Sequence, residues 1–381
     1  MDLIHCAHLP NQGWTPPLPV ELDGPDTWVL AFGARAHLET PAVLQALAAA
    51  FPRSVVMGCS SAGEIAGRQV ADGSISVAVA RFHATQLRRT STPLSSAQES
   101  AAAGHRLATQ LPAEGLRAVF LLAGGVAVNG TDLLKGLAAA LPAGVAVSGG
   151  MAGDGSRFER TWVLDAGKPD EGCVTAVGLY GSSLRIGHGC SGGWTEFGPE
   201  RRITRSEGNV LYELDGQPAL GLYKHYLGHL AADLPGSALL FPLSLRTDAG
   251  CAPVVRTILG LDEAAQSMTF AGDMPLGSVT QLMRTNVDRL VASAEDAAGQ
   301  ALQGLGMQGP VLALSVSCIG RRLVMGERTE EEVEAVVDAL PAGSVHAGFY
   351  SYGEFGTSQG GGAAELHNQT MTLTIFSETA A

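Results

Sequence analysis

The sequence lacks the long apolar run that a membrane-spanning helix needs. No stretch approaches the roughly 20 uninterrupted apolar residues that cross a bilayer, and residues 1–5 are not a basic region leading into an apolar one. These absences predict a cytoplasmic protein that makes no membrane contact. A composition of 46% apolar and 16% charged residues supplies the buried surface of an ordered fold.

Cysteine pairs and basic clusters are also missing. The six cysteines are scattered without a CxxC pair, so we expect reduced thiols rather than disulfides or a structural zinc site. A net charge of −13 repels a phosphate backbone, and Lys and Arg form no run long enough for a basic stripe. We therefore expect no nucleic-acid partner.

Glycine is abundant, with 49 residues, and much of it marks an internal repeat. Three segments share an Ala/Leu-rich helix, a proline, a β-branched run and a glycine loop closed by an acid. They run from Ala50 to Glu64, from Ala140 to Asp154 and from Ala339 to Glu354. Apolar runs typical of buried strands precede them, at residues 28–32, 118–122 and 311–316. The pattern predicts repeated β-α-β units.

A chain of 381 residues is too long for one compact core. We predict an α/β fold of two domains, residues 1–182 and 183–381, built from pseudo-repeated βαβ units with mixed sheets flanked by helices. The boundary follows the apolar strand at residues 174–180. A degenerate fourth copy, without the glycine loop or the acid, is expected between Pro218 and Phe241.

The repeated glycine loops are the first candidates for a binding site, because ligands of βαβ folds lie beyond the carboxyl ends of the strands. The loops offer Cys59, Ser60, Ser61 and Glu64 in the first copy, Asp154 in the second, and Tyr350, Ser351, Tyr352 and Glu354 in the third. We expect the three acid-tipped turns to meet at one hollow. In the alternative interpretation, which weighs equally, the acids cap nearby N–H groups and the glycines only permit tight turns.

Several of these segments resemble a known family. Residues 58–65 look like the signature of the FIST N-terminal domain. Residues 348–354, followed by His367 and Asn368, look like the end of the FIST C-terminal domain. Residues 208–220 and 253–256 are similar to the opening of that C-terminal domain and to a family strand that bears an arginine. Together these motifs cover most of the chain in the right order.

The resemblance implies that residues 1–182 form a FIST N-terminal domain and residues 183–381 a FIST C-terminal domain. It implies a small-ligand sensor of bacterial signal transduction rather than an enzyme. Members of the family are usually fused to, or encoded beside, histidine kinases or cyclic-dinucleotide signalling enzymes, so such a protein is the expected partner. A homodimer is compatible with this role.

Stand-alone members of the family include a haem-binding branch that senses nitric oxide, which implies a non-covalent haem b here. Haem needs an axial ligand, usually histidine or cysteine, in an apolar pocket. The candidates are His188 and Cys190, after an apolar strand, and His225 with His229, four residues apart on a predicted helix. A hydrogen-bonded loop histidine and an exposed helix face are the alternatives. No CxxCH motif for covalent attachment occurs.

Other family members have been proposed to bind amino acids or related metabolites, and such a ligand asks for different residues. Arg256 or Arg321 would clamp the carboxylate, and Glu64 or Glu354 would meet the ammonium group. For Arg321 the alternative is a surface ion pair, which stabilises little.

A hydrolase is the third class of function. Cys59, Ser60 or Cys318 would be the nucleophile and His346 or His367 the base. The sequence contains no Gly-x-Ser-x-Gly elbow, HExxH pair, P-loop or GxGxxG fingerprint. A hydroxyl or thiol beside glycine is common in turns, so this function is the weakest of the three.

Overall fold

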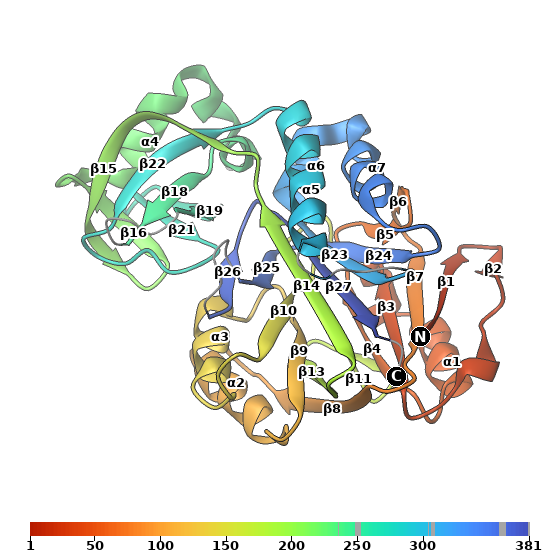
Figure 1. Cartoon of the computed structure of the whole chain (residues 1–381). Coiled ribbons are helices and arrows are strands. Elements are labelled where there is room, and N and C mark those ends of the chain that lie inside the picture. The colour runs from red at the N-terminus through yellow and green to blue at the C-terminus, as the bar shows by residue number, and fades with distance from the viewer. Residues whose placement is uncertain (235, 248–252, 304, 306–308, 358–362, 380–381) are drawn as a thin grey trace.

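The computed structural model describes residues 1–234, 236–247, 253–303, 305, 309–357 and 363–379 (Figure 1). Three β-sheets form its body, and each is built on the same four-strand repeat. The four strands of a repeat lie in the order third, second, fourth, first. The second and third strands are parallel, and the others are antiparallel to their neighbours.

The elements of the repeats are as follows along the chain. The first repeat contains β1 (Asp2–Leu9), β3 (Thr27–Gly33), α1 (Ala42–Ala50), β4 (Val55–Ser60) and β7 (Ile75–Arg81). The second contains β8 (Gln86–Pro93), α2 (Ser100–Thr109), β9 (Leu116–Ala123), α3 (Gly130–Ala138), β10 (Ala146–Met151) and β13 (Cys173–Tyr180). The third contains β14 (Leu184–Ser191), α5 (Val287–Leu302), β23 (Leu312–Cys318), α6 (Ile319–Met325), α7 (Glu330–Ala339), β24 (Val345–Ser351) and β27 (Met371–Glu378).

A hairpin leaves each repeat after its acid loop and extends the sheet of another repeat. The hairpins are β5 (Glu64–Ala66) with β6 (Gln69–Ala71), β11 (Val163–Asp165) with β12 (Lys168–Asp170), and β25 (Gly353–Gly356) with β26 (Glu365–His367). They join β24, β4 and β10, respectively. Because each repeat completes the sheet of another, the three repeats depend on one another for their backbone hydrogen bonds.

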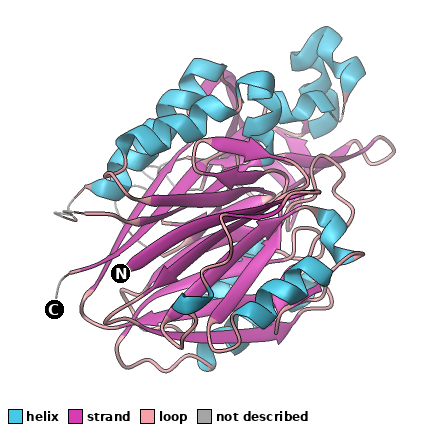
Figure 2. Ribbon diagram, turned by 90° about the vertical axis from the view of Figure 1, so that its right-hand side faces the viewer, coloured by secondary structure: helices cyan, strands magenta, loops and turns pink. Residues whose placement is uncertain are grey.

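The inner faces of the three sheets share one core. The ring of Trp28 on β3 packs edge-on against Phe120 on β9 and Phe376 on β27, at centroid distances of 5.3 and 5.6 Å. Helices cover the outer faces, as Figure 2 shows. Every residue of β3 and β23 is buried, so the prediction of strands buried on both faces is confirmed there.

Residues 195–284, between β14 and α5, form a separate antiparallel sheet with its own core (Figure 1). Its elements are β15 (Thr195–Glu207), β16 (Val210–Leu214), β17 (Gln217–Pro218), α4 (Ala219–Leu227), β18 (Leu243–Arg246), β19 (Val254–Arg256), β20 (Ile258–Asp262), β21 (Ser267–Phe270) and β22 (Val279–Arg284). The prediction of a fourth copy is wrong. Helix α4 follows β17, a short strand antiparallel to β16, and packs in the core of the inserted sheet.

The remaining elements are short. They are β2 (Gly13–Thr15), which pairs with β1, and the 3-10 turns at Val20–Leu22, Arg35–Leu38, Ala97–Glu99, Gly228–Asp233, Gly236–Leu240 and Gly326–Arg328. No helix among the described residues is both long enough and apolar enough to cross a bilayer. Five cysteines are described and are free thiols, and Cys251 lies outside the described residues.

The predicted fold class is confirmed: the protein is α/β, with mixed sheets flanked by helices. The repeat occurs three times, in the three copies that the glycine loops indicated. The division into two domains at residues 182 and 183 stays a prediction. That boundary lies in the turn between β13 and β14.

Candidate functional site

The three glycine loops meet at the centre of the molecule. Three backbone hydrogen bonds join them, from the amides of Ala62, Gly153 and Tyr352 to the carbonyls of Tyr350, Ser60 and Met151, at 2.8, 3.0 and 3.1 Å. Each bond connects a different pair of repeats. The three turns therefore meet, as expected. The three acids that close them, however, accept hydrogen bonds from different groups.

Glu64 closes the first loop and is 1% exposed. Its Oε1 accepts a hydrogen bond from the Ser61 hydroxyl, and its Oε2 accepts from the amide and the hydroxyl of Ser74, both at 3.0 Å. Burial raises the pKa of Glu64 to about 7, although these hydrogen bonds work in the opposite direction. Glu64 thus secures its own loop and also reaches the wall of a cleft.

Glu354 repeats this geometry in the third loop. Its Oε1 accepts from the Ser351 hydroxyl at 2.7 Å, and its Oε2 accepts from the amide and the hydroxyl of Thr370 at 3.2 and 2.9 Å. Burial raises its pKa to about 8. Glu64 and Glu354 therefore have the same structural role. Both accept hydrogen bonds from nearby N–H groups, as the alternative to a ligand-binding role predicts.

Asp154 is held differently. It accepts hydrogen bonds from the Tyr352 hydroxyl and from the amides of Phe158, Glu159 and Arg160. Burial opposes ionisation, but these hydrogen bonds outweigh it and lower the pKa of Asp154. The carboxylate therefore shapes the loop that follows it rather than facing a ligand.

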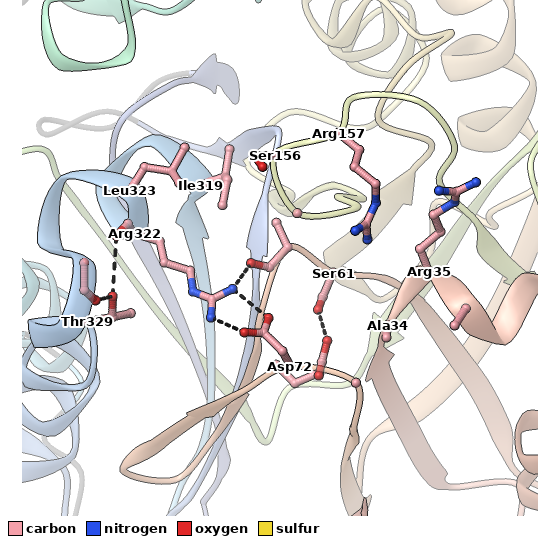
Figure 3. Close-up of a pocket in the computed structure, with 16 residues that line it drawn as sticks. Ala34, Arg35, Ser61, Asp72, Ser156, Arg157, Ile319, Arg322, Leu323 and Thr329 are labelled. Carbon is pink, nitrogen blue, oxygen red and sulfur yellow. Dashed lines mark hydrogen bonds and ion pairs between the residues drawn. The ribbon is translucent and has the colours of Figure 1, made fainter. Parts of the chain in front are cut away.

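A cleft of about 680 Å³ opens where β3, β4 and β23 end. All three repeats line it, with Ala34 and Ser61 from the first, Gly155 and Arg157 from the second, and Ile319 and Arg322 from the third (Figure 3). Ala34, Ser61 and Ile319 each directly follow a strand. This is the position at which βαβ folds place their ligands.

One wall of the cleft is an ion pair. The guanidinium of Arg322 on α6 donates to both carboxylate oxygens of Asp72, at 2.8 and 2.7 Å, and to the carbonyl of Ala62 at 2.5 Å. The same guanidinium lies over the ring of Tyr350, 5.6 Å from its centroid. Gly63 is needed beneath it, because φ is +144° there and an added Cβ would come within 2.7 Å of Arg322 Nη1.

The opposite wall carries two more arginines (Figure 3). Arg35 donates to Glu159 at 3.2 Å through Nη1, but its Nε is buried without a partner in the described part of the chain. The exposed side chain of Arg157 makes no hydrogen bond or ion pair with any described residue. Its charge helps to lower the pKa of Asp72, after the larger effect of Arg322. The cleft therefore presents Arg157 and the Nε–H of Arg35 without a partner among the residues that the structure describes.

The sequence did not single out these arginines, although two signals were present. Arg35 follows strand β3 as Arg321 follows β23, and that position made Arg321 a candidate. Arg322 is next to Arg321 on α6. Neighbouring residues on a helix point about 100° apart, so the choice between them depends on how the helix is rotated.

The two arginines that were predicted to clamp a carboxylate have other partners. Arg321 is 0% exposed and donates twice to Glu332 and also to the carbonyls of Leu290 and Gly192. Arg256 is buried at the edge of the inserted sheet and donates to three backbone carbonyls. Burial lowers the pKa of Arg256 to about 10. Neither lines the cleft with Glu64, so the structure does not bring the predicted clamp to this site.

The candidate haem histidine His188 lies on a strand of the third repeat, and the pair His225 and His229 lies in the inserted residues 195–284. His188 is packed against Gly356, where an added Cβ would come within 2.3 Å of Nε2, and its Nδ1 lies 3.2 Å from the Thr374 hydroxyl. Burial lowers the pKa of His188 to about 4. His225 and His229 are exposed, on α4 and on the turn after it. The described surroundings of these histidines do not form the apolar slot that a haem ring occupies.

The predicted nucleophiles are inaccessible. Cys59 and Ser60 are 0% exposed, and the Ser60 hydroxyl accepts from the amide of Trp162. Burial raises the pKa of Cys59, and that of Cys318 as well. His346 and His367 are buried with backbone partners. The candidate nucleophiles and bases therefore do not line the cleft.

The remaining predicted residues, Tyr350 and Asn368, are buried and do not line the cleft. Tyr350 is 0% exposed and its hydroxyl donates to Glu332 at 2.5 Å. Asn368 is fully buried, and its side-chain oxygen and nitrogen have no partner among the described residues. Ser61 and Glu64 are thus the predicted residues that line the cleft.

Comparison with known proteins identifies the family. Residues 27–217 match the FIST N domain and residues 219–357 match the FIST C domain. The chain belongs to the FIST family. The two matches meet inside the inserted sheet, between β17 and α4. The resemblance predicted from the sequence motifs is confirmed.

Two relatives of this FIST protein are named only as uncharacterized proteins. It is 26% identical to an uncharacterized protein of Mycobacterium tuberculosis over 377 residues, which cover 93% of this chain and 92% of that protein. It is 24% identical to an uncharacterized protein of Methanocaldococcus jannaschii over 210 residues, 51% of this chain and 39% of that one. Among solved structures, a cyanuric acid hydrolase from A. caulinodans aligns with a TM-score of 0.40 and 9% identity, covering 100% of this chain and 99% of the hydrolase.

Proposed function

We propose that this FIST protein is a ligand-sensing input module of bacterial signal transduction whose small ligand binds in the cleft. The observation that supports this site is the set of unsatisfied cationic donors, Arg157 and the Nε of Arg35. A volume of about 680 Å³ also suits a small ligand, since such sites measure roughly 300–1,000 Å³.

The position of the cleft suits a sensor. A ligand there would touch the loop after Asp154, the end of β3 and helix α6, which belong to three different repeats. Binding would favour the arrangement of repeats in which these contacts coexist, which is how a ligand shifts a conformational equilibrium. We propose that a cytoplasmic histidine kinase or cyclic-dinucleotide signalling protein reads this shift.

Binding without catalysis is the simpler function for the cleft. Ser61 and Glu64 resemble a nucleophile and its base, because the hydroxyl donates to a carboxyl with a pKa of about 7. Ser351 and Glu354 make the same contact where both residues are 0% exposed. Because the same serine–glutamate contact recurs where solvent cannot reach it, turn formation explains the contact. The Ser61–Glu64 pair therefore gives no reason to propose a hydrolase.

A small polar metabolite fits the cleft better than haem does. Haem b remains the prediction of the family resemblance, but its three candidate histidines lie outside the cleft, and His188 lies on β14, away from His225 and His229 in the inserted residues 195–284. The cleft walls carry Arg35, Arg157 and the Arg322–Asp72 pair, whereas a haem pocket is mainly apolar. An amino acid or related metabolite is therefore the preferred ligand class.

The site is tested by thermal unfolding of the purified protein with a panel of small metabolites. A true ligand at a hundredfold excess over its Kd should stabilise the fold by about 2.7 kcal/mol. Arg157→Gln should remove most of this stabilisation. Arg117→Gln is the matched control, because Arg117 is an exposed arginine near the start of β9 and outside the cleft. Equal stabilisation of both variants would place the ligand elsewhere.

A further inference from the structure

The N–H groups of the cleft that lack a partner among the described residues belong to two arginines, of which Arg35 also pairs with Glu159 through Nη1. Arg157 has no partner among the described residues, and the buried Nε–H of Arg35 points at no acceptor there. A buried N–H without a partner costs roughly 1–3 kcal/mol. An oxyanion placed between these two side chains would satisfy both, and the planar guanidinium fork matches carboxylate and phosphate oxygens.

The acidic groups of the cleft are already used. Both oxygens of Asp72 accept from Arg322, and both oxygens of Glu64 accept from Ser61 and Ser74. An ammonium group in the cleft would have to compete with Arg322 for Asp72. Arg322 holds Asp72 by two hydrogen bonds, and such bidentate guanidinium–carboxylate pairs are strong because both partners are charged. The Ala62 carbonyl is also taken by Arg322.

We infer that the ligand is a small anion without a cationic group, such as a dicarboxylate or a phosphate-bearing metabolite, held by Arg157 and Arg35. This inference rests on the proposed function and narrows its ligand class, since it disfavours a zwitterionic amino acid. One acidic group of the ligand lies between Arg157 and the Nε–H of Arg35, whose Nη1 is paired with Glu159. The other end faces Arg322, whose guanidinium is the third cation of the cleft.

The experiment compares ligands that differ by one group. Glutarate and glutamate share a five-carbon chain with two carboxylates, and only glutamate carries an ammonium group. Inorganic phosphate separates phosphate recognition from carboxylate recognition, and cadaverine supplies a cation of similar length. Affinities are measured by calorimetry and thermal unfolding at constant ionic strength. We expect glutarate or phosphate to bind at least tenfold more tightly than glutamate, and cadaverine not to bind.

Variants assign the binding to the cleft. Arg157→Gln and Arg35→Gln should each weaken the anion about tenfold or more, and Arg117→Gln should leave its Kd unchanged. Glutamate or cadaverine binding more tightly than the anions, and losing affinity in Arg157→Gln, would overturn the inference while leaving the sensor site in place. Binding of none of the four probes, or anion binding that is equal in all variants, would overturn both.

Discussion

Glu64 and Glu354 occupy equivalent points of the first and third repeats and accept hydrogen bonds from equivalent donors. Each accepts from a serine hydroxyl three residues earlier in its loop. Each also accepts from the amide and hydroxyl of the residue just before the last strand of the repeat, Ser74 before β7 and Thr370 before β27. The acid therefore ties its loop to the strand that closes its own repeat.

This geometry predicts how stability depends on pH. Burial raises the pKa of Glu354 from 4.5 to about 8. The folded state then binds the proton more tightly than the unfolded state, so the stability from this group is fully present below pH 4.5 and is lost as the pH rises through about 8. Glu354→Gln, a neutral isostere, should flatten this decline by roughly 1–3 kcal/mol between pH 5 and pH 8.

Urea unfolding of the unmodified protein and of Glu354→Gln, each at pH 5 and at pH 8, measures the effect. Glu64→Gln should give a similar flattening that is complete nearer pH 7. Glu331→Gln on α7, whose carboxylate pairs with Arg328 at the surface, is the control and should leave the profile close to that of the unmodified protein. An unchanged pH profile in Glu354→Gln would show that the carboxyl is ionised in the folded state.

The sequence contains enough information for the repeats but not for their assembly. The Pro-to-acid spacing locates all three β-α-β units, because each unit is local in the chain. The exchanged hairpins could not be predicted, since β5 pairs with β24, about 280 positions away. The inserted sheet interrupts the third repeat between β14 and α5, which separates strands of that repeat by more than 100 residues.

The candidate site was predicted only in part for a related reason. Ser61 and Glu64 are in a repeated motif and were found. Arg35, Asp72 and Arg157 are outside the repeated motif, and their proximity depends on how the three repeats pack around the centre. Arg321 was preferred to its neighbour Arg322, but packing of α6 turns Arg321 inward to Glu332.

The buried pair of Arg321 and Glu332 predicts a large loss of stability when it is broken. Both side chains are 0% exposed, and Glu332 also accepts from Ser317 and Tyr350. Glu332→Gln leaves a buried guanidinium without its counter-charge, which should cost about 3–5 kcal/mol. Chemical denaturation measures the change in the free energy of unfolding. Glu331→Gln should cost less than about 1 kcal/mol, and a similar small loss for Glu332→Gln would contradict this role.

Two glycine-to-alanine substitutions should have opposite effects. Gly348 on β24 lies against β23, and an added Cβ would come within 1.9 Å of the carbonyl oxygen of Ser315. Gly348→Ala should destabilise the fold by at least about 3 kcal/mol, because the backbone of two central strands must separate. Gly299 on the exposed side of α5 has open space around it, so Gly299→Ala should stabilise by about 0.5–1 kcal/mol. Thermal unfolding of both variants tests the signs.

An absorption spectrum decides whether a haem binds. His188 packs against Gly356 and Thr374, and His225 and His229 are exposed. His225 lines a separate pocket that it shares with the polar side chains of Arg201 and Gln217, whereas a haem pocket is mainly apolar. After protein mixed with haemin is passed through gel filtration, the protein fraction should therefore show no Soret absorbance. A sharp Soret band that survives gel filtration would contradict this expectation. Substitution of His188, His225 and His229 by alanine, one at a time, would then identify the ligand, and loss of the band in one variant would restore the haem-sensor function.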